Sequence, residues 1–246
     1  MKALAENLAH LEEAIDAACR RAGRSPADVE LMAVSKTFPA SAIMEAAQLG
    51  LTLFGENRVQ EFASKALNAA ALRERTGESA LRIHLIGHLQ SNKAARAVEI
   101  FDGVDSLDSV KLAERLNDAA GKLGKRLPVL IEVKLSPEET KGGLGPESAE
   151  AAELLERLPD LAHLETHGLM TIAPWGAPDD VTRACFRRLR TLRDRWAQAY
   201  PRLGLDVLSM GMSGDFALAI EESATRIRIG TALFGKRSPQ PAPEPE

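Results

Sequence analysis

Short apolar segments alternate with longer amphipathic segments along most of the chain. The apolar segments are rich in Val, Ile and Leu, which is typical of strands buried on both faces of a parallel sheet. They predict strands at 29–35, 51–54, 82–86, near 103–106, and at 128–133, 164–170, 207–210 and 226–229. The segments between them carry apolar residues at helical spacing, and they predict helices at 40–49, 58–75, 91–97, 109–122, 147–157, 179–199 and 214–222.

Eight strands joined by helical connections predict an α/β fold, a single (β/α)8 barrel of the TIM type. A doubly wound open sheet is the competing fold. The number of strands, and the polar residues that follow so many of them, favour the barrel. Residues 2–22 predict an extra N-terminal helix, which could fill the place after the eighth strand. We expect one barrel domain over 1–236 and a disordered, proline-rich tail over 237–246.

Composition narrows the function classes. The 246-residue chain is 45% hydrophobic with a net charge of −4, which suits one soluble domain and argues against binding to nucleic acid or a membrane surface. No apolar run is long enough to span a membrane, and the N-terminal segment is unlike a signal peptide. Cys19 and Cys185 lie far apart in predicted helices, so we expect reduced thiols and a cytoplasmic protein.

A lysine stands where the first strand passes into a turn. Lys36 follows the apolar run 29–34 and precedes Thr37-Phe38-Pro39. A lysine inside a barrel is unfavourable unless it has a charge partner or covalent chemistry to perform. One hypothesis is that Lys36 forms a Schiff base with an aldehyde cofactor. The alternative is that its side chain simply reaches solvent from the strand end.

Polar residues also follow the other predicted strands. In a barrel of this type the carboxyl ends of the strands form the functional mouth. The candidates for this mouth are therefore Lys36, Asn57, His84 to His88, Ser106, the loop 136–143, Met170, Thr171, Ser213 and Arg228 to Thr231.

The last two strand ends predict a phosphate site. Gly211-Met212-Ser213-Gly214 leads into a predicted helix, and Gly230-Thr231 follows the eighth strand. Small residues expose backbone N–H groups, and the loops after strands seven and eight commonly hold a phosphate in such barrels. Ser213 and Thr231 could donate hydroxyl hydrogen bonds to it. For each residue taken alone, ordinary turn formation or helix capping is the alternative.

The eighth strand alternates arginine and isoleucine over 226–229. If the isoleucines face the helices, Arg226 and Arg228 point into the barrel, where each guanidinium needs acceptors. We expect Arg226 to pair with an inward carboxylate, Glu132 or Glu165. Arg228 either hydrogen-bonds an acceptor atom of a cofactor ring or forms a structural ion pair.

Longer blocks of sequence carry a family resemblance. They are AVSK at 33–36, FGENRVQE at 54–61, HLIGHLQSNK at 84–93, GLM at 168–170, LSMGMS at 208–213 and RIGTALFG at 228–235. Together, and in this order over about residues 5–236, they resemble the pyridoxal phosphate homeostasis protein family. The resemblance implies a barrel of the alanine racemase type that binds pyridoxal 5′-phosphate (PLP).

The same resemblance implies roles for single residues. Lys36 matches the Schiff-base lysine, Arg228 the arginine that faces the pyridine nitrogen, and Asn57 a polar residue near the cofactor. Ser213, Gly230 and Thr231 match the phosphate cradle. With Met212, the expected cofactor-binding set is Lys36, Asn57, Met212, Ser213, Arg228, Gly230 and Thr231. We assign no metal ligands and no catalytic residue.

At other positions the sequence gives a less specific indication of the residue's role. We expect His84 to be a core histidine with satisfied hydrogen bonds. Lys141 matches a loop lysine that meets solvent or the cofactor phosphate. Phe38 stands where some relatives carry a second lysine, and the chain ends in Lys236-Arg237 and the proline-rich tail.

The function implied is PLP homeostasis without amino-acid turnover: a monomer that holds PLP and passes it to PLP-dependent apo-enzymes. An arginine at the pyridine nitrogen weakens the cofactor as an electron sink, which suits storage. The first alternative is an amino-acid racemase, which needs a second base. Two-domain racemases take that base, a tyrosine, from an added β-domain, whereas the one tyrosine here, Tyr200, ends a predicted helix on the far side of the barrel. The second alternative is a lysine aldolase on the same fold.

Overall fold

The structure is a computed structural model, and it describes residues 2–65, 72, 74, 81–136, 138 and 142–235. Lys141, Lys236 and the predicted tail over 237–246 lie outside the described residues, as does much of the second half of the predicted helix 58–75. Within the described ranges, no helix combines the length and the hydrophobicity that a membrane crossing requires.

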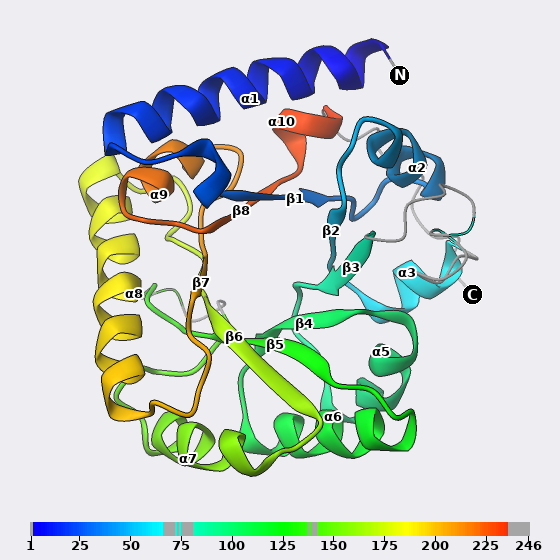
Figure 1. Cartoon of the computed structure of the whole chain (residues 1–246), viewed down its shortest axis with the longest axis vertical. Helices are drawn as coiled ribbons and strands as arrows, with labels where there is room; N and C mark the ends of the chain where they lie inside the picture. Colours follow the sequence, from blue (N-terminus) through cyan, green and yellow to red (C-terminus); the bar gives the residue numbers. More distant parts are fainter. Residues whose placement is uncertain are drawn as a thin grey trace.

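Eight parallel strands hydrogen-bond in sequence order and close into a barrel, which confirms the predicted fold (Figure 1). The ring closes where the first strand pairs with the last, with Glu30 opposite Arg226 and Ala33 opposite Ile229. The strands are β1 (Glu30–Val34), β2 (Leu53–Glu56), β3 (Arg82–Leu85), β4 (Gly103–Leu107), β5 (Leu127–Glu132), β6 (Leu164–Met170), β7 (Val207–Ser209) and β8 (Arg226–Ile229).

Helices surround the barrel, and each of them except the N-terminal α1 comes after a strand in the chain (Figure 1). The α-helices are α1 (Lys2–Ala22), α2 (Ala40–Gln48), α3 (Val59–Ser64), α5 (Ala94–Ile100), α6 (Val110–Lys122), α7 (Ala149–Arg157), α8 (Asp179–Ala199), α9 (Phe216–Glu221) and α10 (Thr231–Phe234), with short 3-10 turns η1 (Pro26–Asp28), η2 (Ser91–Lys93) and η3 (Leu158–Asp160). The predicted helix at 91–97 is thus a 3-10 turn followed by α5. The short helix α10 was not predicted, because four residues are too few to show a periodic pattern.

The N-terminal helix takes the place expected for it. It lies across the outside of the barrel beside α9 and α10 (Figure 1), and its apolar stripe of Leu4, Leu8, Leu11 and Ile15 joins the core. The Asn7 side-chain amide also donates to the carbonyl of Leu233 at 2.9 Å. This helix therefore covers the segment that follows the last strand.

The main hydrophobic core lies between the strands and the helices. Ala33, Phe54 and Ile83 belong to it and are fully buried, as are Phe62 and Phe101, whose rings stack with centroids 5.1 Å apart. Full burial of a large apolar side chain contributes about 1.5–3 kcal/mol. Most of the hydrophobic stabilisation therefore lies outside the ring of strands, which leaves its interior available for polar groups.

The amino-terminal half of the barrel interior holds a buried charge network. The Arg226 guanidinium donates from Nε to Glu30 Oε2 at 2.8 Å and from Nη1 to Asp105 Oδ2 at 3.1 Å. His84 Nδ1 lies 2.8 Å from the other oxygen of Asp105, so this histidine is a hydrogen-bonded core residue, as expected. Burial alone would raise the pKa of Asp105, but His84 and Arg226 outweigh it and hold that pKa below its ordinary value of 3.8.

The predicted partners of Arg226 were wrong. Arg226 begins β8 at the amino end of the barrel, and the register of β8 against β1 places Glu30 directly beside it. Glu132 ends β5 at the opposite end of the barrel, and Glu165 pairs with Arg126 at 3.1 Å. The inward direction of the arginine followed from strand alternation, but its partners depend on the register between strands.

Glu132 is a buried acid at the carboxyl end of the barrel, with 6% of its surface exposed. Its pKa is raised to about 7, chiefly by burial and also by the nearby negative charge of Asp108, while Arg228 and His88 act in the opposite direction. Glu132 therefore changes charge in the physiological pH range.

Replacing Asp105 with Asn should lower the free energy of unfolding by about 3 kcal/mol, because it leaves buried Arg226 with one carboxylate instead of two. The depressed pKa of Asp105 contributes stability above its unfolded-state value, and that contribution is lost as pH falls through its lower folded-state value. The deficit of the variant should therefore shrink below about pH 4. Urea denaturation at several pH values measures both effects.

The matched control is Asp160→Asn, which removes an acid from the exposed pair with Arg202. We expect it to cost less than about 1 kcal/mol. Equal losses for the two variants would contradict the role given to the buried network.

The variant Glu132→Gln tests the buried acid. Because the folded-state pKa is raised, the wild-type protein should lose stability as pH rises from 4.5 to about 7. A shift of that size corresponds to about 3 kcal/mol, so the variant should gain on the wild type by an amount of this order between pH 4.5 and pH 8. Glu99→Gln, at an exposed pair with Arg96, should show no such pH-dependent gain. Parallel stability curves for wild type and Glu132→Gln would show that the acid ionises normally.

Candidate functional site

A cavity of about 690 Å³ opens at the carboxyl ends of the strands, a size typical of small-molecule sites. Every residue predicted to bind a cofactor lines it: Lys36, Asn57, Met212, Ser213, Arg228, Gly230 and Thr231. These residues come from the ends of β1, β2, β7 and β8, so closure of the barrel brings together positions that are far apart in the sequence.

Other predicted mouth residues have different surroundings. Ser106 donates to the carbonyl of Gly87 at 2.8 Å, and His88 lies 3.1 Å from Asp108 with an exposed side chain. The carbonyl oxygen of Thr171 accepts a hydrogen bond from Arg228 Nη2 at 2.8 Å. Lys141 lies outside the described residues.

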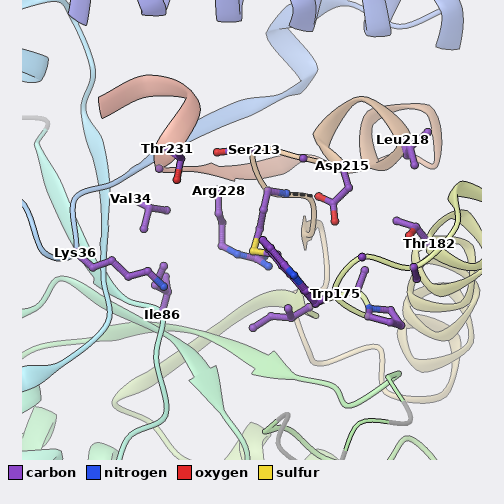
Figure 2. A pocket seen from close by; sticks show the side chains of 18 of the residues that line it. Val34, Lys36, Ile86, Trp175, Thr182, Ser213, Asp215, Leu218, Arg228 and Thr231 are labelled. Carbon is purple, nitrogen blue, oxygen red and sulfur yellow. Dashed lines mark hydrogen bonds between the residues drawn. The ribbon is translucent and has the colours of Figure 1, made fainter. Parts of the chain in front are cut away.

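Lys36 extends into the cavity from the end of β1, with its side chain running toward Ile86 (Figure 2). The lysine sits in a tight turn in which the N–H of Phe38 donates to the carbonyl of Ser35 at 3.1 Å. The ring of Phe38 packs against Phe234 of α10, with centroids 5.1 Å apart. The turn therefore fixes the direction in which the amine leaves the strand, and the aromatic pair connects it to the segment after β8.

Arg228 enters the same cavity from β8 (Figure 2) and is almost completely buried. Its Nη1 donates to the carbonyl and the hydroxyl of Ser209 at 2.7 and 2.9 Å, and its Nη2 donates to the carbonyl of Thr171 at 2.8 Å. Burial lowers the pKa of Arg228, although the charges of Asp105, Glu132 and Asp215 oppose the effect. Its hydrogen-bonding neighbours are thus neutral, unlike those of Arg226.

A guanidinium has about five N–H donors, and the contacts above occupy three of them. Among the residues that the structure describes, the Nε–H and the second Nη2–H of Arg228 find no acceptor. Arg228 is therefore suited to bind an acceptor atom of a ligand in the cavity, and the structural ion pair considered from the sequence is not what holds it.

Ser213 and Thr231 lie together on one side of the cavity (Figure 2). The Ser213 hydroxyl accepts the N–H of Ala232 at 3.2 Å, which joins the loop after β7 to the start of α10. Gly211 precedes this loop with a φ of +92°, and a Cβ there would lie 2.6 Å from the Cβ of Ala219. Only glycine fits this position, so the loop can pass close to α9 and direct Ser213 toward the cavity.

Asn57 is placed by a close approach between two strand ends. A Cβ on Gly87 would lie 2.2 Å from the carbonyl oxygen of Asn57 and 2.8 Å from its side chain. The absence of a side chain at Gly87 therefore allows Asn57 to pack over the end of β3 and still face the cavity.

The sequence did not predict the wall formed by the loop after β6 and by α8. Trp175, Asp179 and Thr182 line the cavity there, and Trp175 is 83% exposed at its rim. The segment 171–174 was noted as the end of a strand, but nothing in its pattern indicated that the next residues turn back over the mouth. Asp215, also unpredicted, accepts the N–H of Met212 at 2.5 Å and braces the Ser213 loop (Figure 2).

Known proteins match this chain over nearly its whole length. The family model of the alanine racemase N-terminal domain matches residues 6–238. The pyridoxal phosphate homeostasis protein of Vibrio cholerae is 43% identical over 239 residues, which covers 96% of this chain and 98% of the relative.

Solved structures agree with these matches. PipY of Synechococcus elongatus, whose structure is known without and with PLP bound, is 45% and 44% identical in the two comparisons, with TM-scores of 0.81 and 0.80. Both comparisons cover 94% of this chain and 100% of PipY. Alanine racemase of Clostridium difficile is 16% identical with a TM-score of 0.72, and the match covers 96% of this chain and 57% of the racemase. That likeness concerns the fold alone. The chain belongs to the pyridoxal phosphate homeostasis protein family, which is built on the alanine racemase N-terminal domain.

Proposed function

We propose that this protein binds PLP reversibly, as a Schiff base on Lys36, and maintains the supply of this cofactor in the cytoplasm without turning over amino acids. The observation that carries the proposal is the convergence of Lys36, Arg228 and the Ser213–Thr231 pair on one cavity. The PLP-bound structure of the related PipY supports the choice of ligand. PLP-dependent apo-enzymes are the proposed recipients, and the proposed active form is a monomer.

The donor set of the cavity matches the chemical groups of PLP. When bound, PLP supplies an aldehyde that reacts with a primary amine. Lys36 brings that amine into the cavity, and the hydroxyls of Ser213 and Thr231 face a common region where they can donate to a phosphate. Gly230 lines the cavity beside them.

Arg228 is suited to the pyridine nitrogen. It has donors to spare, and it stays positively charged near neutral pH even with a lowered pKa. A cation that donates to the ring nitrogen disfavours protonation of that nitrogen, which weakens the ring as an electron sink. Arg228 therefore supports holding the cofactor more than it supports chemistry on an amino acid.

Racemisation is the second candidate, because the family model takes its name from alanine racemase. Abstraction and return of a proton on opposite faces require a second base beside the ring. The one tyrosine of the chain, Tyr200, caps the C-terminal end of α8 just before β7, so it lies at the amino ends of the strands, opposite the cavity. This position favours the binding function over the racemase.

Lys36→Ala should abolish covalent attachment of PLP, because it removes the amine that extends into the cavity. Wild-type protein mixed with PLP should develop the visible absorption band of an imine, and the variant should not. Lys111→Ala, at an exposed lysine of α6, should behave as wild type. An unchanged band in Lys36→Ala would refute the anchor.

Incubation of PLP-loaded protein with L-alanine and other amino acids tests turnover. We expect no racemisation approaching about 1 s⁻¹, the lower range of ordinary enzyme rates. Chiral chromatography of the amino acid measures the rate. Turnover at or above that value, lost in Lys36→Ala, would establish the racemase instead.

A further inference from the structure

The turn that carries Lys36 has a strained backbone. Thr37 has a φ of +69°, in the left-handed region that a β-branched residue rarely adopts. This conformation is unfavourable by about 1–2 kcal/mol, and it persists only where surrounding contacts impose it. The contacts that impose the left-handed conformation on Thr37 also set the position of the neighbouring Lys36.

On one side of Lys36, the whole of Ser35 is held. Its N–H donates to the carbonyl of Gly55 at 3.0 Å, and its hydroxyl donates to Glu56 Oε1 at 2.7 Å. Its carbonyl accepts from Lys65 Nζ at 3.0 Å, in addition to the N–H of Phe38. Ser35 is fully buried, so each of these bonds is shielded from water.

On the other side of Lys36, the N–H of Thr37 donates to Glu61 Oε1 at 2.5 Å. The same carboxylate oxygen lies 3.7 Å from Lys65 Nζ, which in turn donates to Glu56 Oε1 at 2.5 Å. Lys65 therefore connects the contacts on both sides of Lys36. We refer to Glu56, Glu61 and Lys65 as the clamp.

Stability alone does not account for the clamp. Glu56 is completely buried, and its Oε2 has no hydrogen-bond partner among the described residues. Burial raises the pKa of Glu56, although Lys65 opposes the shift. A buried ion pair with an unsatisfied oxygen is commonly no more stabilising than a well-packed apolar pair. An apolar pair could not form the hydrogen bonds that the clamp makes with the backbone of the turn.

The clamp is also next in sequence to two residues that line the cavity. Lys36 directly follows Ser35, and Asn57 directly follows Glu56. Both Lys36 and Asn57 line the cavity. The Glu56–Ser35 contact therefore lies directly behind the part of the wall from which the Lys36 amine extends.

We propose that Glu56, Glu61 and Lys65 are positioning residues that hold the strained turn so that the Lys36 amine meets the aldehyde of PLP. The proposal rests on the proposed function. In the step concerned, Lys36 Nζ adds to the aldehyde carbon, a C=N bond forms, and the aldehyde oxygen leaves as water. Displacement of a reacting group by about 1 Å can slow a reaction by about a hundredfold, so a loosened turn should slow this step.

Two variants loosen the clamp without leaving an unpaired buried charge. Lys65→Met/Glu56→Gln replaces the ion pair with neutral side chains of similar size. Glu61→Ala removes the acceptor of the Thr37 N–H and leaves the Lys65–Glu56 pair in place. The matched control is Lys125→Met, because Lys125 Nζ also donates to a backbone carbonyl, that of Val98, at 2.9 Å, but lies at the amino end of β5.

Two measurements separate positioning from general damage. The first is the rate of PLP attachment to Lys36, followed by the imine band and by mass spectrometry after borohydride reduction. The second is the affinity for pyridoxine 5′-phosphate, which carries an alcohol in place of the aldehyde and so reports the non-covalent contacts alone.

Both clamp variants should attach PLP at least about tenfold more slowly than wild type, with an affinity for pyridoxine 5′-phosphate within about threefold of wild type. Lys125→Met should match wild type in both measurements. Wild-type attachment rates in both clamp variants would overturn the proposal, as would equal losses of attachment rate and pyridoxine 5′-phosphate affinity. Failure of the proposed function would look different, because wild-type protein itself would then acquire no borohydride-stable adduct on Lys36.

Discussion

The structure depends on two cations that enter the same cavity from different strands. Lys36 comes from β1 and Arg228 from β8, and these strands are neighbours only because the barrel closes. Arg228 is buried and donates three hydrogen bonds to neutral acceptors. Its two other N–H groups have no acceptor among the described residues, so they can bind an acceptor atom of a ligand in the cavity. A ligand that carries an acceptor atom, an anionic group and an aldehyde would accept from these N–H groups and would react with the Lys36 amine.

The barrel interior is divided along its axis. At the amino ends of the strands, Arg226 is balanced by Glu30 and Asp105 in a closed network that needs no ligand. At the carboxyl ends, Arg228 has no carboxylate within ion-pair distance among the described residues. The hydrophobic core lies outside the ring, so the charges inside are arranged for structure at one end and for binding at the other. The strained turn at Thr37 belongs to the binding end, where such strain is commonly found.

Much of this could be read from the sequence, and the parts that could not share a physical reason. Strand alternation placed Arg228 inside the barrel, and the position of Lys36 at a strand end placed it at the mouth. The partners of Arg226 were missed because they depend on the register between β8 and β1, which no local pattern encodes. The clamp was missed for the same reason: Glu56 and Glu61 lay within a noted motif, but their contacts with Lys65 and the turn depend on how α3 lies against the ends of β1 and β2.

The central claim is tested most directly by a crystal structure of the protein soaked with PLP. The account predicts continuous electron density from Lys36 Nζ to the cofactor, with the ring nitrogen against Arg228 and the phosphate between Ser213 and Thr231. Cofactor density joined to another lysine, or a ring turned so that its phosphate meets Arg228, would contradict it.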